Sequence, residues 1–214
     1  MTTQTLLAAP TWFRACADDN TRDFWSARKD DYLRTVRGPF LELLRAAGED
    51  PDRWRVYRPH QDVRFRPGAP PLRTFLGALS AADDGTGRYV QVDASGLLAS
   101  SGLPSMAADQ LGRWRAAVAG EPGERLDEVL LLARAAGATV QSGYPKPLAR
   151  VPRGHPADHP RAELLRWKGV EVLRRLADVG DAPAAWLRAT WDAGRGLRDW
   201  LAEHVGASEL ERRR

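Results

Sequence analysis

Hydrophobic and polar positions follow a helical period near both ends of the chain and a period of two in between. From Asn20, a residue type that favours helix N-caps, apolar side chains recur at helical spacing to Val36. A second helical segment covers 40–47, and Gly38-Pro39 between the two should kink or split the helix. The first part of the chain is therefore predicted to be helical.

Short alternating segments in the middle of the chain predict four strands. They are expected at 54–65, 73–80, 88–93 and 96–101. The connections between them are too short for parallel crossovers, so the strands should be antiparallel neighbours. Pro59, which has no N–H to donate, should force a bulge or an edge position on the first strand.

Helical spacing returns after the fourth strand. The fold class is therefore predicted to be α+β, an antiparallel sheet of about four or more strands flanked by N-terminal and C-terminal helices. Residues 11–206 should form a single domain, with a loose N-terminus at 1–10 and a frayed basic tail at 207–214. After the fourth strand, helices are expected over 107–119 and 123–136, followed by a short strand over 137–142 and an irregular segment over 143–160. A helix should then run from His159-Pro160 to Lys168. The segment at 169–176 fits a strand or a helix, and a helix pair is expected over about 183–204.

Composition narrows the class of protein. The chain has 214 residues, of which 43% are hydrophobic and 28% charged, as is typical of a soluble globular domain. The longest apolar run, Val129–Ala133, is far shorter than the ~20 residues that span a bilayer. The N-terminus lacks the basic region of a signal peptide, and the lone Cys16, expected to be a small buried side chain, fits the cytosol. The prediction is a cytoplasmic protein with no membrane association.

The net charge of +4 and the pI near 9.6 do not by themselves indicate a nucleic-acid partner. Nearly all basic residues are arginines spread along the chain and interleaved with acidic ones, and the one run is Arg212–Arg214. The sequence has no stripe of alternating aromatic and basic residues on which bases could stack. No nucleic-acid binding is expected, and the sequence leaves the oligomeric state open.

Charged side chains occupy alternate positions of the first predicted strand. Arg58, His60, Asp62 and Arg64 would share one face, while Phe65 would point the other way into a core. A strand usually carries uncharged side chains at such positions. Four ionisable groups on one strand face therefore either meet water or form a site.

An anion site is the favoured interpretation of these charges, because arginine forks bind carboxylate or phosphate at two points. The irregular loop Val151–Pro160 should fold back over the strand and add side chains to it. The alternative is a structural network in which Arg64 and Arg153 pair with Asp62 or Asp158. The predicted ligand-binding residues are Arg58, Asp62, Arg64, Arg153, His159, Arg166 and Lys168.

Four blocks of the sequence carry a family resemblance. They are Asn20–Trp25 with Lys29 and Tyr32, Tyr57–Pro59 with Asp62–Phe65, Tyr89–Val92 with Gly96-Leu97, and Pro152–Gly154 with His159-Pro160, Leu164–Arg166 and Lys168. In their order and spacing the chain resembles the domain of unknown function 2461 family of bacterial proteins, over nearly its whole length. That family has no settled activity, so the resemblance implies no particular reaction.

The chain departs from that family after Phe65. The family usually continues with a lysine-rich stretch of the type Ser-Lys-Asp-Lys-Ser-Pro-Tyr-Lys-Thr-His. A member that lacks these side chains has lost the ligand they serve or binds a different one. In this chain Pro67, Ala69 and Arg73 replace the lysines, Leu72 replaces the tyrosine and Phe75 replaces the histidine.

No metal or other cofactor is predicted. His155 and His159 have the His-x3-His spacing of a metal site, with His60 and Asp62 as further candidates. A proline follows each of the two spaced histidines, so both lie in a loop rather than on one helix face. The sequence also lacks the Gly-x-Ser-x-Gly elbow of a serine nucleophile and a glycine-rich loop that opens a helix.

The favoured function is a small-molecule or anion-binding site on the polar sheet face, in a binding protein or an enzyme of undetermined class. The alternative is a non-catalytic interaction or scaffolding protein, which the lost lysine, tyrosine and histidine positions favour. A closed cleft over Arg58, Asp62 and Arg64 would favour the first interpretation. A flat, ion-paired surface would favour the second.

The absence of a required metal can be tested by thermal unfolding with and without a chelator. We expect EDTA to leave the melting temperature unchanged, because the spaced histidines lie in a loop. A large drop that zinc restores would instead support metal binding by His155 and His159.

Overall fold

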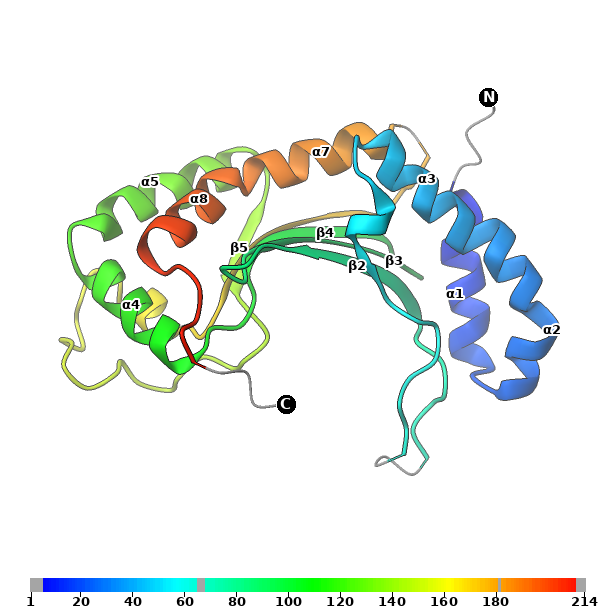
Figure 1. The fold of residues 1–214 in the computed structure, drawn as a ribbon, viewed down its shortest axis with the longest axis horizontal. Coiled ribbons are helices and arrows are strands. Elements are labelled where there is room, and N and C mark those ends of the chain that lie inside the picture. The colour runs from blue at the N-terminus through cyan, green and yellow to red at the C-terminus, as the bar shows by residue number, and fades with distance from the viewer. Residues whose placement is uncertain (1–5, 65–67, 181, 211–214) are drawn as a thin grey trace. The chain divides into compact units, whose positions relative to one another are not determined.

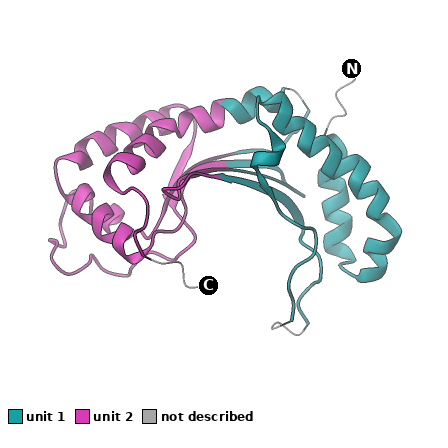
Figure 2. Ribbon diagram, in the orientation of Figure 1, with its two compact units in different colours: residues 1–80, 89–99, 175–188 teal, residues 81–88, 100–174, 189–214 magenta. Residues whose placement is uncertain are grey.

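The computed structural model describes residues 6–64, 68–180 and 182–210. The chain divides into two compact units, which Figure 2 shows in different colours. Unit 1 comprises residues 1–80, 89–99 and 175–188, and unit 2 comprises residues 81–88, 100–174 and 189–214. The single domain expected over 11–206 stays a prediction. Residues 1–5 of the expected loose N-terminus, Phe65 and the Arg212–Arg214 run lie outside the described residues.

The α+β fold class is confirmed, because the described strands form one six-stranded antiparallel sheet between helical segments (Figure 1). The strand order is β1-β2-β3-β4-β6-β5, so the segment at 169–176 is a strand and the first strand lies at an edge, as Pro59 predicted. The strands are β1 at Arg55–Val56, β2 at Phe75–Ala81, β3 at Gly87–Asp93, β4 at Gly96–Leu103, β5 at Thr139–Ser142 and β6 at Val170–Leu176.

The predicted strand at 54–65 is wrong in its length, since regular pairing stops after Val56. Pro59 has no N–H for the ladder, and beyond it the chain leaves the sheet as an irregular arm (Figure 1). The arm returns alongside itself through one isolated bridge, His60 to Leu72, and a bond from Arg73 N to Pro59 O at 2.7 Å. The charged positions therefore lie on an arm rather than on a sheet face.

The N-terminal part of unit 1 is helical, as predicted. Helix α2 is capped by Thr21, whose hydroxyl accepts a bond from Phe24 N at 3.1 Å, so the prediction of Asn20 as the cap is wrong. The described elements are a 3-10 helix at Leu6–Ala8, α1 at Ala9–Asp18, α2 at Arg22–Tyr32, a π-helix at Leu33–Arg37, α3 at Gly38–Ala46 and a 3-10 helix at Pro51–Arg53.

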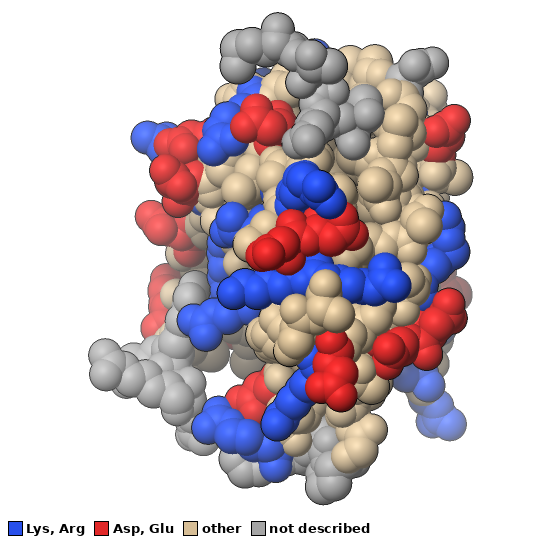
Figure 3. Space-filling model, turned by 90° about the vertical axis from the view of Figure 1, so that its right-hand side faces the viewer, with Lys and Arg blue, Asp and Glu red and all other residues tan. Residues whose placement is uncertain are grey.

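The prediction that Gly38-Pro39 kinks or splits the helix is wrong in its form, since the helical path continues through a π-helix at Leu33–Arg37. Gly38 N donates to Leu33 O, five residues back, and α3 then begins at Gly38. Since Pro39 has no N–H and its ring crowds the preceding turn, the wider turn lets the helical path continue. The face of the molecule in Figure 3 carries interspersed basic and acidic side chains. Arg34 of the π-helix pairs with Asp31 of α2 at 3.0 Å.

Asn20 instead clamps the backbone at the base of the arm. Its amide oxygen accepts from Leu72 N at 2.9 Å, and its amide nitrogen donates to Leu72 O at 3.1 Å. The buried Cys16 thiol lies beside it, 4.0 Å from Arg73 O. A side-chain amide here replaces the backbone partner that a neighbouring strand would supply, so the α1–α2 corner fixes where Leu72 and Arg73 lie.

Unit 2 has its own core, formed by helices and the ends of strands. The predicted helix from His159-Pro160 to Lys168 is shorter, because α6 begins only after Arg161 and ends at Arg166. Its helices are α4 at Ala108–Ala119, α5 at Pro122–Ala135, α6 at Ala162–Arg166, the second half of α7 at Pro183–Ala193, and α8 at Arg195–His204. Its largest fully buried side chains include Trp114, Trp200, Leu126, Leu130 and Leu165. None of the helices in the described ranges combines the length and apolar composition of a bilayer span.

The Asn20 clamp can be tested by urea unfolding. Asn20→Ala removes the partner of the Leu72 N–H, and an unpaired backbone group of this kind costs roughly 1–3 kcal/mol of unfolding free energy. Asn20→Asp is the matched control, since it keeps the acceptor for Leu72 N and should lose less. Equal stability of wild type and Asn20→Ala would show that the clamp does not hold the arm.

Candidate functional site

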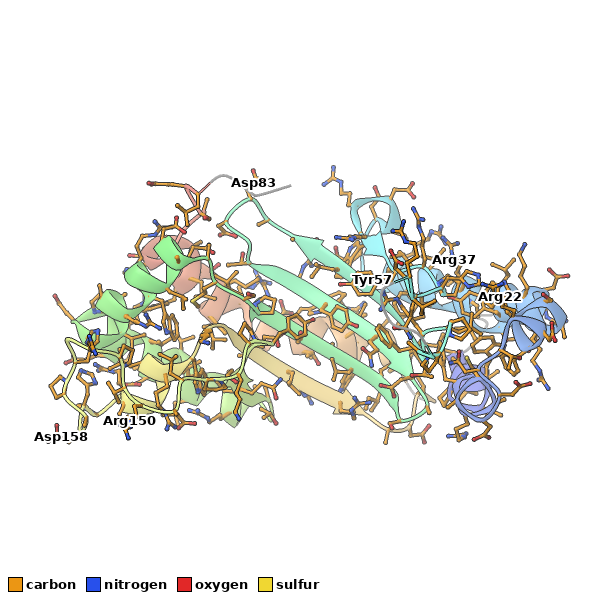
Figure 4. The ribbon with its side chains drawn as sticks, turned by 90° about the horizontal axis from the view of Figure 1, so that it is seen from below. Arg22, Arg37, Tyr57, Asp83, Arg150 and Asp158 are labelled. Atoms are coloured by element: carbon orange, nitrogen blue, oxygen red, sulfur yellow. The ribbon has the colours of Figure 1, made fainter. Side chains whose placement is uncertain are left out.

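The strands of unit 1 separate a buried face from a polar face. In β3, Val90 and Val92 are completely buried, whereas Tyr89, Gln91 and Asp93 between and beside them are half-buried. This alternation is the normal consequence of the strand pleat. Helix α3 lies on the buried side (Figure 1), and Figure 4 looks onto the polar face, where it labels Tyr57.

A glycine lies between two tyrosines on this polar face. Tyr57 N donates to Gly77 O at 2.8 Å, and a Cβ on Gly77 would lie only 2.5 Å from the Tyr89 hydroxyl oxygen. The Tyr89 side chain therefore lies across the position where a larger residue would project. The ring centres of Tyr57 and Tyr89 are 6.2 Å apart, with the ring planes inclined by 40°.

A row of hydrogen bonds continues along β3 from the second tyrosine. The Tyr89 hydroxyl donates to Gln91 Oε1 at 2.7 Å, and Gln91 Nε2 donates to Asp93 Oδ2 at 2.6 Å. Arg175 Nη1, from β6, lies 3.1 Å from each oxygen of Asp93. Each side chain fixes the next one, so Tyr89 is held in one orientation before any ligand arrives.

Arg73 occupies the end of the polar face where the arm begins. Its guanidinium carbon lies 5.7 Å from the ring centre of Tyr57 and 5.6 Å from that of Phe75. Its Nε is buried and has no hydrogen-bond partner among the described residues. The cationic group is thus held by two aromatic rings, while one of its donors lacks an acceptor.

A cleft of about 560 Å³ opens beside this arginine. Two of the predicted site residues, Arg58 and Asp62, line it, and their role in binding stays a prediction. The ring of His60 forms part of its wall and makes an edge contact with Trp25, at 5.0 Å between ring centres. The lining residues are Arg55, Val56, Tyr57, Arg58, His60, Gln61, Asp62 and Arg73.

Arg64 forms a two-point ion pair with Asp62. Nη2 lies 2.6 Å from Oδ2 and Nε lies 3.0 Å from Oδ1, and the two side chains are 78% and 56% exposed. The side-chain bond from Arg64, followed by its backbone N–H, holds the pKa of Asp62 below its usual value. This local pair matches one part of the structural-network alternative, and an exposed pair of this kind contributes little to stability.

The other four predicted residues belong to unit 2, so their convergence with Arg58, Asp62 and Arg64 stays a prediction. Arg153 is exposed, in a turn that needs the positive φ of Gly154 (91°). His159 accepts a bond from Arg161 N at its Nδ1, 2.9 Å away, and Lys168 is half-buried. Arg166 lines a separate cleft of about 540 Å³ in unit 2.

A buried carboxyl group in unit 2 was not anticipated from the sequence. Glu171 lies on β6 opposite Gln141 of β5, and Ser100 Oγ of β4 donates to its Oε1 at 2.9 Å. Burial raises the pKa of Glu171, and the bonds from Ser100 and Gln141 only partly oppose that rise. This direction is the one expected of an acid that is buried beside neutral partners.

The structure bears on two other candidates from the sequence, a metal site and the thiol of Cys16. Within the described residues, no three His, Cys, Asp or Glu side chains come together as a metal site. Cys16 is buried, as expected, and burial raises the pKa of its thiol to about 11. A thiol of this kind is a poor nucleophile near neutral pH.

Several residues around the cleft were not predicted from the sequence, although the sequence pattern indicates some of them. The alternation Tyr89-Val90-Gln91-Val92 already separates a polar face from a core face. Arg73 stands where the family usually has a lysine, which marks a retained positive charge. The contacts of Tyr57 with Arg73 and Tyr89 arise from strand pairing and had no signal in the sequence.

Comparisons with known proteins agree with the family resemblance. Residues 8–190 match the model of a family described as conserved hypothetical protein (DUF2461). No curated protein matches the chain significantly. Among solved structures, an uncharacterized protein from Methanothermobacter thermautotrophicus is similar with a TM-score of 0.42 and 11% identity, over 78% of this chain and 99% of that one.

The raised pKa of Glu171 gives a test of its burial. An acid whose pKa is raised by folding adds stability below its ordinary pKa, and this stability is lost as the pH rises through the raised value. Glu171→Gln keeps the shape without the charge, so its stability advantage over wild type should grow as the pH rises above the ordinary pKa of a glutamate, about 4.3. Urea unfolding at a series of pH values measures this, and a difference independent of pH would contradict the assignment.

Proposed function

This chain belongs to the DUF2461 family of conserved hypothetical proteins, and we propose that it binds a small oxyanion, a phosphate or carboxylate group, in the cleft of unit 1. The observation that carries the proposal is the state of Arg73. Its guanidinium is fixed against two aromatic rings beside the cleft, and its buried Nε has no acceptor among the described residues. A bound oxyanion in the cleft would give this guanidinium group a charged acceptor.

The charges around the cleft support an anionic ligand. Arg55, Arg58 and Arg73 contribute three positive groups to its lining. Asp62 also lines it, but both of its oxygens already accept bonds from Arg64. The cleft therefore keeps an excess of positive charge, which attracts an anion.

The rigidity of the site also supports binding. The Asn20 amide and the strand pairing hold the backbone on both sides of Arg73, and the rings of Tyr57 and Phe75 restrict its side chain. An arginine that is free before binding loses conformational entropy when the ligand orders it. The Arg73 side chain is already ordered in the folded protein, so binding should lose less entropy. We place this binding in the cytosol.

The competing function is a non-catalytic interaction protein. The exposed Asp62–Arg64 pair and the exposed Arg58 favour it, because an arm with such side chains can contact a protein partner without closing over a ligand. The two functions differ in what they require of Arg73. Small-ligand binding depends on this half-buried arginine, whereas an interaction through the arm depends on its exposed charges.

Isothermal titration with inorganic phosphate and with acetate tests the proposal. At low ionic strength we expect saturable binding that Arg73→Gln weakens by roughly tenfold or more, the loss of about one charge-assisted bond. The melting temperature of the ligand-free variant should stay close to that of wild type or rise, since a buried unpaired donor is removed.

Arg53→Gln is the matched control, because Arg53 is an exposed arginine of unit 1 outside the cleft lining. It should bind phosphate as wild type does. Absence of saturable heat with either anion, or an equal loss in Arg53→Gln, would overturn the proposal. Loss of binding to a protein partner in Arg58→Gln, without any anion binding by wild type, would support the interaction function instead.

A further inference from the structure

We infer that unit 2 holds a second binding site, for a small zwitterion that carries a carboxylate and an ammonium group, as a free α-amino acid does. The site is the cleft of about 540 Å³ that Arg166 lines. All of its lining residues belong to unit 2, so it is separate from the anion site proposed in unit 1. The inference rests on side chains of opposite charge that line this cleft without pairing with each other.

The cleft lies between helix α6 and the irregular loop that precedes it, since its lining residues come from these two elements. The loop is bonded to the helix at both ends. Leu148 N donates to Arg166 O at 2.9 Å, and Ala162 N donates to His159 O at 2.8 Å. Between these bonds, Val151 packs against the hydrophobic core of unit 2. The loop is therefore held against α6, and the cleft belongs to the folded structure of this unit.

Glu163 and Arg166 have a spacing at which helical segments of this chain otherwise form ion pairs. An acid three residues before an arginine is paired with it at Asp31–Arg34, Glu42–Arg45 and Asp192–Arg195. On α6, by contrast, the Nε of Arg166 is buried while Glu163 is exposed, and neither side chain has a hydrogen bond or ion pair among the described residues. The two charges therefore line one cleft with the pair between them left open.

Arg150 and Arg166 form the part of the cleft that would bind a carboxylate. Arg150, labelled in Figure 4, is exposed and comes from the loop, whereas Arg166 is half-buried and comes from the helix. Within the described parts of the chain, Arg150 also has no hydrogen-bond or ion-pair partner. A carboxylate bound in the cleft would give both guanidinium groups a counter-charge, which arginine commonly binds at two points.

Glu163 would bind the ammonium group of the same ligand. A simple anion in this cleft would meet the Glu163 carboxylate as well as the two arginines, and like charges repel. A zwitterion avoids this repulsion, because it presents a cation to the acid and an anion to the arginines. His155 adds one further polar side chain to the lining. The rest of the lining suits a ligand with an apolar side chain, since it consists of Ala149, Val151, Ala157 and Ala162.

Isothermal titration with L-leucine, 4-methylpentanoate and L-leucinamide tests the inference, because the last two probes each keep only one charge of the amino acid. The protein is the Arg73→Gln variant, in which carboxylate binding by the unit 1 cleft is weakened. At low ionic strength we expect L-leucine to bind roughly tenfold more tightly than either other probe, which corresponds to about one charge-assisted bond. Equal affinity for L-leucine and either single-charge probe, or no saturable heat with L-leucine, would overturn the inference.

Further substitutions in the same variant then locate the two charges. Glu163→Gln should weaken L-leucine binding roughly tenfold and leave 4-methylpentanoate binding unchanged or tighter, because only the ammonium group loses its partner. Arg150→Gln should weaken the binding of both carboxylates. Glu128→Gln is the matched control, an exposed acid of α5 outside the cleft lining, and should bind L-leucine as its parent does. An equal loss in Glu128→Gln, or a loss of both carboxylates in Glu163→Gln, would contradict the assignment.

The two binding proposals can fail separately. A preference for L-leucine in the Arg73→Gln variant supports the unit 2 site, whether or not the wild type binds inorganic phosphate. A preference that is present in the wild type and absent in Arg73→Gln would place the amino acid in the unit 1 cleft and overturn the inference.

Discussion

The pleat of β3 is the constraint on which the rest of unit 1 depends. Because successive side chains must point to opposite faces, Val90 and Val92 can enter the core only if Tyr89 and Gln91 face the other way. Burial of each valine contributes on the order of 1.5–3 kcal/mol relative to exposure, which fixes the register of the strand. Burial of the two valines therefore determines the face on which Tyr89 and Gln91 lie. A shift of one residue in the register of β3 would exchange its buried and polar side chains.

A second constraint acts where the sheet ends. Pro59 stops the backbone ladder, so the arm needs partners from outside the sheet. Asn20 supplies them for Leu72, and Gln61 Nε2 adds a bond to the same carbonyl at 3.0 Å. The α1–α2 corner thereby sets the direction in which Arg73 leaves the backbone, and helical packing far along the sequence positions the cleft.

The elements whose periodicity is local could be predicted from the sequence. The helices, the antiparallel order and the edge position of the first strand followed from spacing, short connections and one proline. The charged residues were predicted on the wrong kind of element, because the alternation of Arg58, His60, Asp62 and Arg64 is the same in a paired strand and in an extended arm. Only the hydrogen bonds of the backbone distinguish the two, and these depend on Leu72 and Asn20, distant in sequence.

The departures from the family motif make physical sense as a set. Leu72, in place of the usual tyrosine, is fully buried beneath the Asn20 clamp. Phe75 stands in place of a histidine, and its ring contacts the guanidinium group of Arg73, which replaces a lysine. A guanidinium stacks on aromatic rings and presents a planar fork, whereas an ammonium is a compact, strongly hydrated charge. Tyr57 and Phe75 thus restrict the guanidinium group of Arg73, and under the proposed function a fixed planar cation would match the shape of an oxyanion as well as its charge.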